Sequence, residues 1–536
     1  MLETQLRANP VREGAGVIAN IDMPFAPCKA FAPSVGSCCG GLAISLYLEE
    51  PSQAACTPGP PGLPIIGNLL QAPKSEVWKV YQKWSQQYGP VIAVKYGHKT
   101  SIILSSAQVV HELLGRRSLK YSERPKLIGL DQVTRGLHSG LMPYGPRWRA
   151  ARALQGTFLR PSIARKYRPL QEVQSQRVIH DLLTTNDFSR CFHRFVTGLF
   201  LTLAYGMPMW PDQSVLEEWD ALSRRKAHLV EPAFSVTGPM AEFFPFLTCL
   251  PAKWQDECND MYNGRTRVFG RYLRMAQSAK SWNWVKQQST HKAAQELDAT
   301  EHAHVMGSLG EAALTPYHAL RTILLAIYLH PVAVAQAQAE LDRVVGTDRL
   351  PTFEDIPQLP YVNAFIKEAV RWRTVMPMFT PRVMREDDEY MGYHIPNGST
   401  VLLNQWAIDH DESTFPMPEE FRPERWIDDP SLPSFFFGLG HRACPGEQVG
   451  NDSLFIVTSR VLWAFHVGKD REGCDIQPQS MYKSVGSTFI NPVPHFDVCF
   501  TPRDQARQSL IEEGFDAAEK DASVLLDQIK DTCQAI

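Results

Sequence analysis

The chain has 536 residues, of which 44% are apolar and 21% charged, and 54 Lys and Arg against 57 Asp and Glu give a net charge of −3. This composition excludes disorder over the bulk of the chain and predicts a globular protein with a sizeable core. The near-neutral charge argues against a nucleic-acid binder, and 11 cysteines in a chain of this length are too few for a disulfide scaffold.

The N-terminal residues 1–57 are predicted to be irregular. No run of about 20 apolar residues occurs in the chain, so no transmembrane helix is predicted. The best N-terminal candidate, residues 35–48, contains three glycines and is followed by two glutamates. It fits neither a spanning helix nor a signal peptide, which would place basic residues before an apolar core.

Ordered structure is predicted to begin at residues 58–67, where closely spaced prolines and glycines make a stiff, extended connector. Residues 91–96 and 101–104 are short β-branched and apolar runs around a Gly-His-Lys-Thr turn, which predicts a hairpin. From residue 107 to residue 346 apolar residues recur at three- and four-residue intervals, the period of amphipathic helices. The clearest helical segments are residues 148–158, 166–183, 191–205 and 318–330.

The C-terminal third predicts a small β region and further helices. Residues 382–401 alternate strand-like runs with turns, and residues 415–435 hold five prolines, which predicts an ordered loop. Helix is predicted over residues 446–465, a strand over 490–500 and a charged amphipathic surface helix over 509–536. The pattern as a whole predicts a mainly α protein with a small β region and a charged C-terminal extension, residues 504–536, and the length alone does not decide the number of domains.

The strongest chemical signal is the segment Phe-Gly-Leu-Gly-His-Arg-Ala-Cys-Pro-Gly at residues 437–446. A thiolate that binds a metal needs a backbone that wraps closely around the sulfur, and Gly440 and Gly446 allow conformations or approaches that a side chain would block. Amide groups after Cys444, at the start of the next helix, can donate to the sulfur and stabilise the thiolate. Arg442 is suited to pair with an anionic carboxylate.

This segment resembles the haem-binding signature of the cytochrome P-450 family, F-G-x-G-x-R-x-C-x-G. The resemblance implies the cytochrome P-450 fold, with one large catalytic domain over residues 58–503, and haem b as cofactor. It makes Cys444 the iron ligand and places Phe437, Gly440 and Arg442 in the haem-binding loop. It also implies a haem-thiolate monooxygenase that uses O₂ and takes electrons from a partner, because the chain carries no flavin or dinucleotide motif.

Further segments occur in the order that the family shows. Glu368-Ala-Val-Arg371 resembles the E-x-x-R of the family's K helix, where i, i+3 spacing puts both side chains on one face. Arg425, in Phe-Arg-Pro-Glu-Arg, resembles the arginine of the family's P-E-R segment. The resemblance implies that Glu368, Arg371 and Arg425 form a buried salt-bridge triad that fixes the loop around the haem.

Three more residues match haem-propionate contacts of the family. Trp148 and Arg152 resemble the W-x-x-x-R of the C helix, and their i, i+4 spacing lets both reach one face. Arg382, in Thr-Pro-Arg after the K helix, matches a third propionate donor by position. The alternative for both arginines is an ordinary solvated side chain.

The segment expected to activate oxygen departs from the family pattern A-G-x-D/E-T-T. The sequence is Glu-Ala-Ala-Leu-Thr-Pro at residues 311–316, which is one residue short when aligned on its flanks; it lacks the acid before Thr315, and Ala313 stands where glycine is usual. Thr315 is the candidate for the alcohol that hydrogen-bonds the bound oxygen. Pro316 removes a helical hydrogen bond and clashes with the carbonyl of Ala312, so it predicts a kink. Glu311, one turn earlier, is a second candidate proton source.

Two interpretations of this departure stay open. The reaction needs less proton delivery because it ends in oxidative coupling, desaturation or rearrangement, or the chain is a divergent or wrongly spliced product with impaired activity. A haem-binding pseudoenzyme and a haem-thiolate isomerase that needs no reductase are the corresponding alternatives to a monooxygenase.

The resemblance extends to fungal enzymes of polyketide and mycotoxin pathways, through the segments at residues 141–146, 281–284 and 371–374. It implies a small apolar or aromatic secondary metabolite as substrate and an NADPH-dependent reductase as electron donor. The family location is the surface of the endoplasmic reticulum membrane. Because no spanning segment is predicted, peripheral membrane association and a cytoplasmic location both stay open.

Overall fold

The computed structural model describes residues 55–534 except residue 74 and the segments 235–252 and 470–489. The N-terminal segment predicted to be irregular therefore lies almost wholly outside the described residues. Its last residues include a short strand, β1 (Ala55–Cys56), which pairs in parallel with β6 (Tyr393–Ile395).

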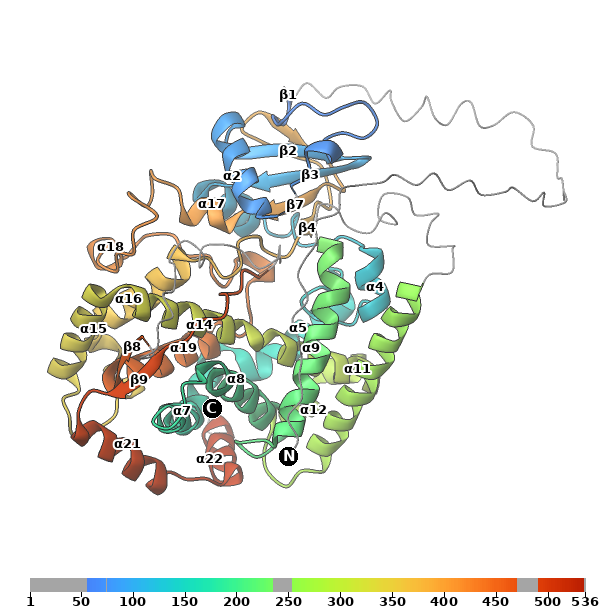
Figure 1. Ribbon diagram of the computed structural model, residues 1–536. Helices are drawn as coiled ribbons and strands as arrows, with labels where there is room; N and C mark the ends of the chain where they lie inside the picture. Colours follow the sequence, from blue (N-terminus) through green and yellow to red (C-terminus); the bar gives the residue numbers. More distant parts are fainter. Residues whose placement is uncertain (1–54, 74, 235–252, 470–489, 535–536) are drawn as a thin grey trace, which may run out of the picture. The chain divides into compact units, whose positions relative to one another are not determined.

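Helices make up most of the described chain (Figure 1). The four helical segments that the sequence predicts most clearly are found as α5, α7, α8 and α14, and the helix predicted over residues 446–465 is found as α19; α7, α14 and α19 stop one or two residues short of the predicted bounds. The α-helices are α2 (Val77–Tyr88), α3 (Ala107–Val110), α4 (Ile128–Thr134), α5 (Pro146–Leu159), α6 (Pro161–Ala164), α7 (Arg168–Asp181), α8 (Phe188–Tyr205), α9 (Gln213–Phe234), α11 (Lys253–Ser278), α12 (Trp284–Ser289), α13 (Ala299–Ala312), α14 (Leu314–Leu329), α15 (Pro331–Val344), α16 (Pro360–Trp372), α17 (Gln405–Asp409), α18 (Arg425–Asp428), α19 (Glu447–Ala464), α21 (Gln505–Ala517) and α22 (Ala522–Gln534).

The β region is small and is built from segments far apart in the sequence. Its four-stranded sheet has the order β2 (Val91–Tyr96), β3 (Lys99–Leu104), β7 (Thr400–Leu403) and β4 (Arg382–Val383). The predicted hairpin is confirmed as the antiparallel pair β2–β3, and β3 continues in parallel onto β7. Figure 1 shows these strands beside α2 and α17. A second sheet joins β1, β6 and β5 (Asp388–Tyr390), and a third joins β8 (Phe465–Gly468) to β9 (Cys499–Pro502).

The largest core cluster lies where α14, α16 and α19 pack together with α8. Helix α14 is apolar over most of its length, so it buries side chains such as Leu324 and Leu325 on more than one face. Trp372 on α16 and Trp463 on α19 are also fully buried. Each large apolar side chain buried in this way contributes about 1.5–3 kcal/mol. Helix α19, which follows the cysteine loop, and the segment before the loop both pack against this core cluster.

Two predictions near the C-terminus are wrong in part. Of the strand predicted over residues 490–500, only the end pairs, in β9. Pro492 and Pro494 have no N–H to donate to a neighbouring strand, which explains why pairing starts beyond them. The helix predicted over residues 509–536 is two helices, α21 and α22. Leu526 on α22 is fully buried in a core cluster, so this segment is docked on the protein by its apolar face.

The long helical stretch Ala299–Leu329 is broken once. Helix α13 ends at Ala312 and α14 starts at Leu314, so the interruption lies at Ala313, in the turn before Pro316. The disturbance of the helix predicted from Pro316 is therefore present as an interruption at Ala313. Among the described residues, this stretch is long and apolar enough, by length and composition, to cross a membrane. It packs against α8, α11 and α19, as a core helix does.

Candidate functional site

A cavity of about 970 Å³ opens between α5, α8, the break between α13 and α14, and the cysteine loop. Most of its wall is apolar, with side chains such as Leu199, Phe200 and Leu309. The residues predicted from sequence that line this cavity are Trp148, Arg152, Thr315, Arg382, Phe437, Arg442 and Cys444. The structure thus brings together seven candidate residues that are separated by up to 296 positions in the sequence. Within the described residues Gly440 is not part of the lining; its role is in the fold of the loop.

The Cys444 thiol lies on the wall of the cavity, just before α19. The backbone N–H of Cys444 donates to the carbonyl of Phe437 at 2.8 Å, which closes the loop. Burial raises the pKa of the Cys444 thiol, while a hydrogen bond from the Gly446 N–H and the charge of Arg152 act to lower it. The amide donor to sulfur that the sequence predicts is therefore present at the N-terminus of the helix.

Gly440 is required by the geometry of the loop, whereas Gly446 is not. Gly440 has φ +67°, and a Cβ atom there would lie 2.2 Å from the carbonyl oxygen of Leu114. At Gly446 a Cβ atom would meet only the sulfur of Cys444, at 3.9 Å, which is an ordinary contact. Gly438, with φ +69°, is the second position that favours glycine. The steric prediction for Gly440 is confirmed and that for Gly446 is wrong.

Four arginines surround the cavity beside the cysteine loop and form what we call the arginine cluster: Arg124, Arg152, Arg382 and Arg442. Burial lowers the pKa of Arg382 and of Arg442 to about 10, and it lowers the pKa of Arg124 and Arg152 as well. The guanidinium of Arg442 lies over the ring of Trp148, 4.5 Å from its centre. These side chains are buried or half-buried, so the interpretation of Arg152 and Arg382 as solvated side chains is wrong.

The arginine cluster is held mainly by backbone carbonyls. Arg152 donates to Ala443, and Arg382 donates to Leu439. Arg442 donates to the carbonyls of Ser122 and Met142, and its Nη1 is buried without a partner among the described residues. Carbonyls orient the guanidinium groups but do not neutralise them. The wall of the cavity is therefore strongly favourable for anionic groups.

Arg124 was not predicted from the sequence. Its side chain donates to the carbonyls of Gly140, Thr380 and Pro381, and so ties the loop before α5 to the segment before β4. Glu123 is the carboxylate whose charge acts on both Arg124 and Arg442. Arg124 carries no spacing pattern of its own; only the fold brings it beside Arg442.

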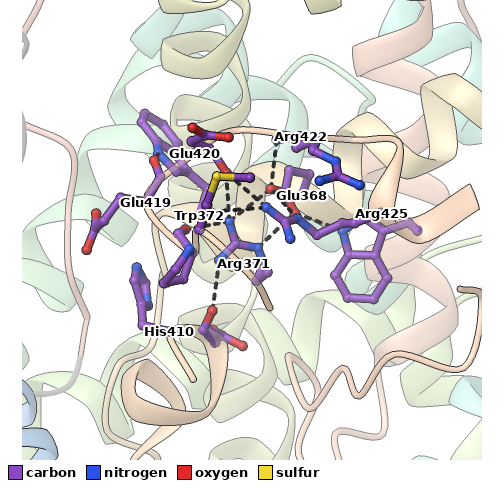
Figure 2. A network of polar contacts seen from close by, with 12 residues as sticks. Glu368, Arg371, Trp372, His410, Glu419, Glu420, Arg422 and Arg425 are labelled. Carbon is purple, nitrogen blue, oxygen red and sulfur yellow. Dashed lines mark hydrogen bonds and ion pairs between the residues drawn. The ribbon is translucent and has the colours of Figure 1, made fainter. Parts of the chain in front are cut away.

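The predicted triad is confirmed as a buried network, shown in Figure 2. Arg371 donates to both carboxylate oxygens of Glu368 at 2.8 and 2.9 Å, and Arg425 donates to one of them at 3.1 Å. Glu368 also accepts hydrogen bonds from the Trp426 indole and from the backbone N–H of Arg422. Five donors thus converge on one carboxylate that is completely buried.

The two arginines of the triad extend the network into the proline-rich loop. Arg371 donates to the carbonyls of Asp409 and Pro418, and Arg425 donates to the carbonyl of Pro416. The loop predicted over residues 415–435 is ordered. Its prolines have no N–H to donate within the loop, and the guanidinium groups of Arg371 and Arg425 donate to its carbonyls instead.

Asp409 provides a test of this region by pH. It is buried, accepts hydrogen bonds from Thr374 and Gln405, and has its pKa raised by burial from 3.8 to about 7. A raised pKa means that the folded state holds the proton while the unfolded state releases it. Stability is therefore lost as pH rises from about 4 to about 7, by roughly 4 kcal/mol in all.

We expect Asp409→Asn, which resembles the protonated acid, to flatten this part of the pH profile and to stabilise the protein at pH 8. Urea unfolding between pH 5 and pH 8 measures the effect. Asp411→Asn, which removes a carboxylate two residues away in the following turn, is the matched control. Parallel profiles for wild type and Asp409→Asn would contradict the prediction.

Thr315 lies in the first turn of α14, directly after the helix break, and lines the cavity. The residue before Thr315 is Leu314, so the position that holds a carboxylic acid in the family pattern is apolar here. Glu311 also lines the cavity, but its carboxylate is engaged by the buried Arg265, with two hydrogen bonds of 2.9 and 3.0 Å.

Comparison with known proteins agrees with this geometry. The family model of cytochrome P450 matches residues 57–500. The "Echilunin cytochrome P450 monooxygenase" of Aspergillus ruber is 42% identical over 478 residues, which cover 88% of this chain and 89% of that protein. The fumitremorgin C synthase of Aspergillus fumigatus is 41% identical over 472 residues, covering 85% and 89%. A zebra fish cytochrome P450 with abiraterone has the same fold, with a TM-score of 0.66 over 80% of this chain and 100% of that one at 24% identity.

The fold and the cysteine loop therefore define a haem-thiolate protein. The chain belongs to the cytochrome P450 family and is a monooxygenase, with relatives in fungal secondary metabolism.

Proposed function

We propose that this enzyme oxidises a small apolar or aromatic secondary metabolite with O₂ and with electrons from an NADPH-dependent reductase. The observation that carries the proposal is the position of the Cys444 thiol, on the wall of a largely apolar cavity of about 970 Å³ and beside the arginine cluster. The relatives named above come from fungal secondary metabolism, which supports this substrate class. A location at the surface of the endoplasmic reticulum membrane is part of the proposal, by family likeness.

The residues present fit haem b. The Cys444 sulfur would hold the haem iron, and the amide donor from Gly446 would stabilise this sulfur as a thiolate. The arginine cluster and Trp148 would bind the two propionates, because the cluster is buried, cationic and oriented by carbonyls. Haem bound through a thiolate supplies O₂ activation and C–H oxidation.

Thr315 is the residue to which we assign proton transfer in the cavity. Its hydroxyl lies at the cavity wall in the turn opened by Pro316 and would hold and pass a proton at Oγ1. Leu314 takes the place of the acid that precedes this threonine in the family pattern. The same observation favours, as a second candidate function, an oxidation that ends without oxygen insertion, such as coupling or desaturation.

The absorption spectrum of the reduced carbon monoxide complex tests the cofactor part of the proposal. The purified protein is expected to give the red-shifted band of a thiolate-bound haem, and absence of this band would overturn it. With the band present, NADPH consumption with a fungal reductase and product analysis separate oxygen insertion from coupling or desaturation. A band without any reductase-supported oxidation would point instead to a haem-binding protein without catalysis or to an isomerase.

Thr315→Ala is expected to lower the ratio of product formed to NADPH consumed by about tenfold or more. Without the hydroxyl, electrons from NADPH would reduce O₂ to peroxide instead of supporting substrate oxidation. Peroxide release and product are measured together. Thr322→Ala, on the same helix but bonded to the His318 carbonyl, is the control and should keep the wild-type ratio. An unchanged ratio in Thr315→Ala would remove the role assigned to this residue.

A further inference from the structure

One part of the cavity wall is polar although the rest is apolar. It is formed by the loop after α4 and by α13, and we call it the polar wall: His138, Ser139, Ser308 and Glu311. Ser308 and Glu311 are one helical turn apart on α13, so both face the loop. Leu141 and Leu309, from the same two elements, keep the surroundings of the polar wall apolar.

The hydrogen bonds of the two serines fix their polarity. Ser308 donates its only hydroxyl hydrogen to the carbonyl of Val305 at 2.8 Å. The hydroxyl oxygens of Ser139 and Ser308 are 2.8 Å apart, and by distance alone either could donate. The Ser308 oxygen also accepts the backbone N–H of Ser139, and its own hydrogen has the Val305 carbonyl as acceptor, so we assign the hydrogen between the two hydroxyls to Ser139. With its hydrogen used in this way, the Ser139 oxygen can offer only lone pairs to the cavity. Ser139 is therefore an acceptor and not a donor.

The other half of the polar wall has the same character. The Glu311 carboxylate is 1% exposed and receives two hydrogen bonds from Arg265, which is itself completely buried. Nε2 of His138 lies 3.3 Å from the second carboxylate oxygen. An ionised carboxylate has only acceptor atoms. Those of Glu311 are paired with Arg265 and His138, so the Ser139 oxygen is the acceptor that this wall offers to the cavity.

The loop that carries Ser139 is held rigidly. The backbone N–H groups of Leu141 and Met142 both donate to the carbonyl of His138, which forms a tight turn. Arg124 donates to the carbonyl of Gly140, so this turn is tied to the arginine cluster. A site of this kind needs no reorganisation before a ligand binds.

We propose that the polar wall is a specificity subsite that reads one N–H or O–H donor on an otherwise apolar, polycyclic substrate. Ser139 accepts the hydrogen bond and Ser308 acts as a positioning residue, because it fixes which way the Ser139 hydroxyl points. The inference rests on the proposed function in so far as the cavity takes an apolar substrate. A ligand with an acceptor atom at the same place would leave two oxygens facing each other without a hydrogen, which costs affinity.

Three tricyclic probes of nearly the same shape test the subsite: carbazole carries N–H, fluorene CH₂ and dibenzofuran an oxygen at the same position. Dissociation constants are measured by equilibrium dialysis on the haem-loaded, resting protein, without reductase or NADPH. We expect carbazole to bind about tenfold more tightly than fluorene and dibenzofuran, the effect of one net hydrogen bond.

Variants separate the two serines. Ser139→Ala is expected to bring the three dissociation constants together. Ser308→Ala frees the Ser139 hydroxyl to donate, so binding of dibenzofuran should improve while that of fluorene stays the same. Ser189→Ala, which removes a hydroxyl from the α8 side of the same cavity, is the matched control and should keep the preference for carbazole.

Equal binding of the three probes to the wild type, or no binding of any of them, would overturn the subsite. So would a preference for carbazole that survives Ser139→Ala. Because no turnover is involved, a protein with the thiolate band and no preference contradicts the subsite alone. A protein that prefers carbazole but lacks the thiolate band contradicts only the cofactor assignment.

Discussion

Glu368→Ala is expected to lower the free energy of unfolding by about 3–5 kcal/mol and to prevent stable haem binding. The substitution removes the acceptor of five hydrogen bonds and leaves the guanidinium groups of Arg371 and Arg425 buried without the carboxylate that pairs with both. Arg371 is 2% exposed, so water cannot replace the lost carboxylate. Since both arginines also hold carbonyls of the proline-rich loop, disorder should spread to that loop.

Urea unfolding and haem content after purification measure this effect. Glu386→Ala is the control: Glu386 pairs with Lys120 at 3.1 Å, but its side chain is 60% exposed. An exposed pair contributes at most about 1 kcal/mol, so this variant should resemble the wild type. Glu368→Gln, which keeps an acceptor but not the charge, should fall between the two. A loss below about 1 kcal/mol in Glu368→Ala would show that the triad does not stabilise the fold.

Cys444→Ser is expected to abolish the thiolate band of the reduced carbon monoxide complex and to reduce oxidation of substrate to the background of the assay. Serine is close to cysteine in size, and its backbone N–H can still donate to the Phe437 carbonyl. Its oxygen, however, is a harder ligand that donates far less electron density to iron. The fold should survive, because the Cys444 side chain contributes little to any core cluster of the described residues.

Cys56→Ser, at an exposed cysteine in β1, is the control for this prediction and should retain both the band and the activity. Circular dichroism separates loss of the ligand from loss of the fold. A thiolate band that persists in Cys444→Ser would mean that another of the cysteines binds the iron, and it would contradict the proposed site.

Much of the fold follows from local patterns. The β2–β3 hairpin, the helices α5, α7, α8 and α14 and the break before Pro316 were predictable because each depends on periodicity or on proline geometry within one segment. The strand predicted over residues 490–500 failed because an apolar run was given more weight than the missing amide donors of Pro492 and Pro494. That α22 is buried could not be predicted, since an amphipathic pattern does not say whether its apolar face meets another element.

The candidate site divides in the same way. Gly440, Arg442 and Cys444 lie within one segment of eight residues, 437–444, so spacing alone revealed them. The triad was predictable because Glu368 and Arg371 lie on one face of a helix. Arg124 and the pairing of Ser139 with Ser308 depend on contacts across about 170 to 260 positions of the chain, where no local pattern exists.

The docking of the two C-terminal helices has a practical consequence. The family match ends at residue 500, yet Arg503 and Arg507 both pair with Asp342 on α15, and Leu526 is completely enclosed. A protein truncated at the family boundaries would lack α21 and α22. The apolar side chains that α22 covers would then be exposed to solvent and would promote aggregation. Recombinant production should therefore retain the tail, and affinity tags belong beyond it.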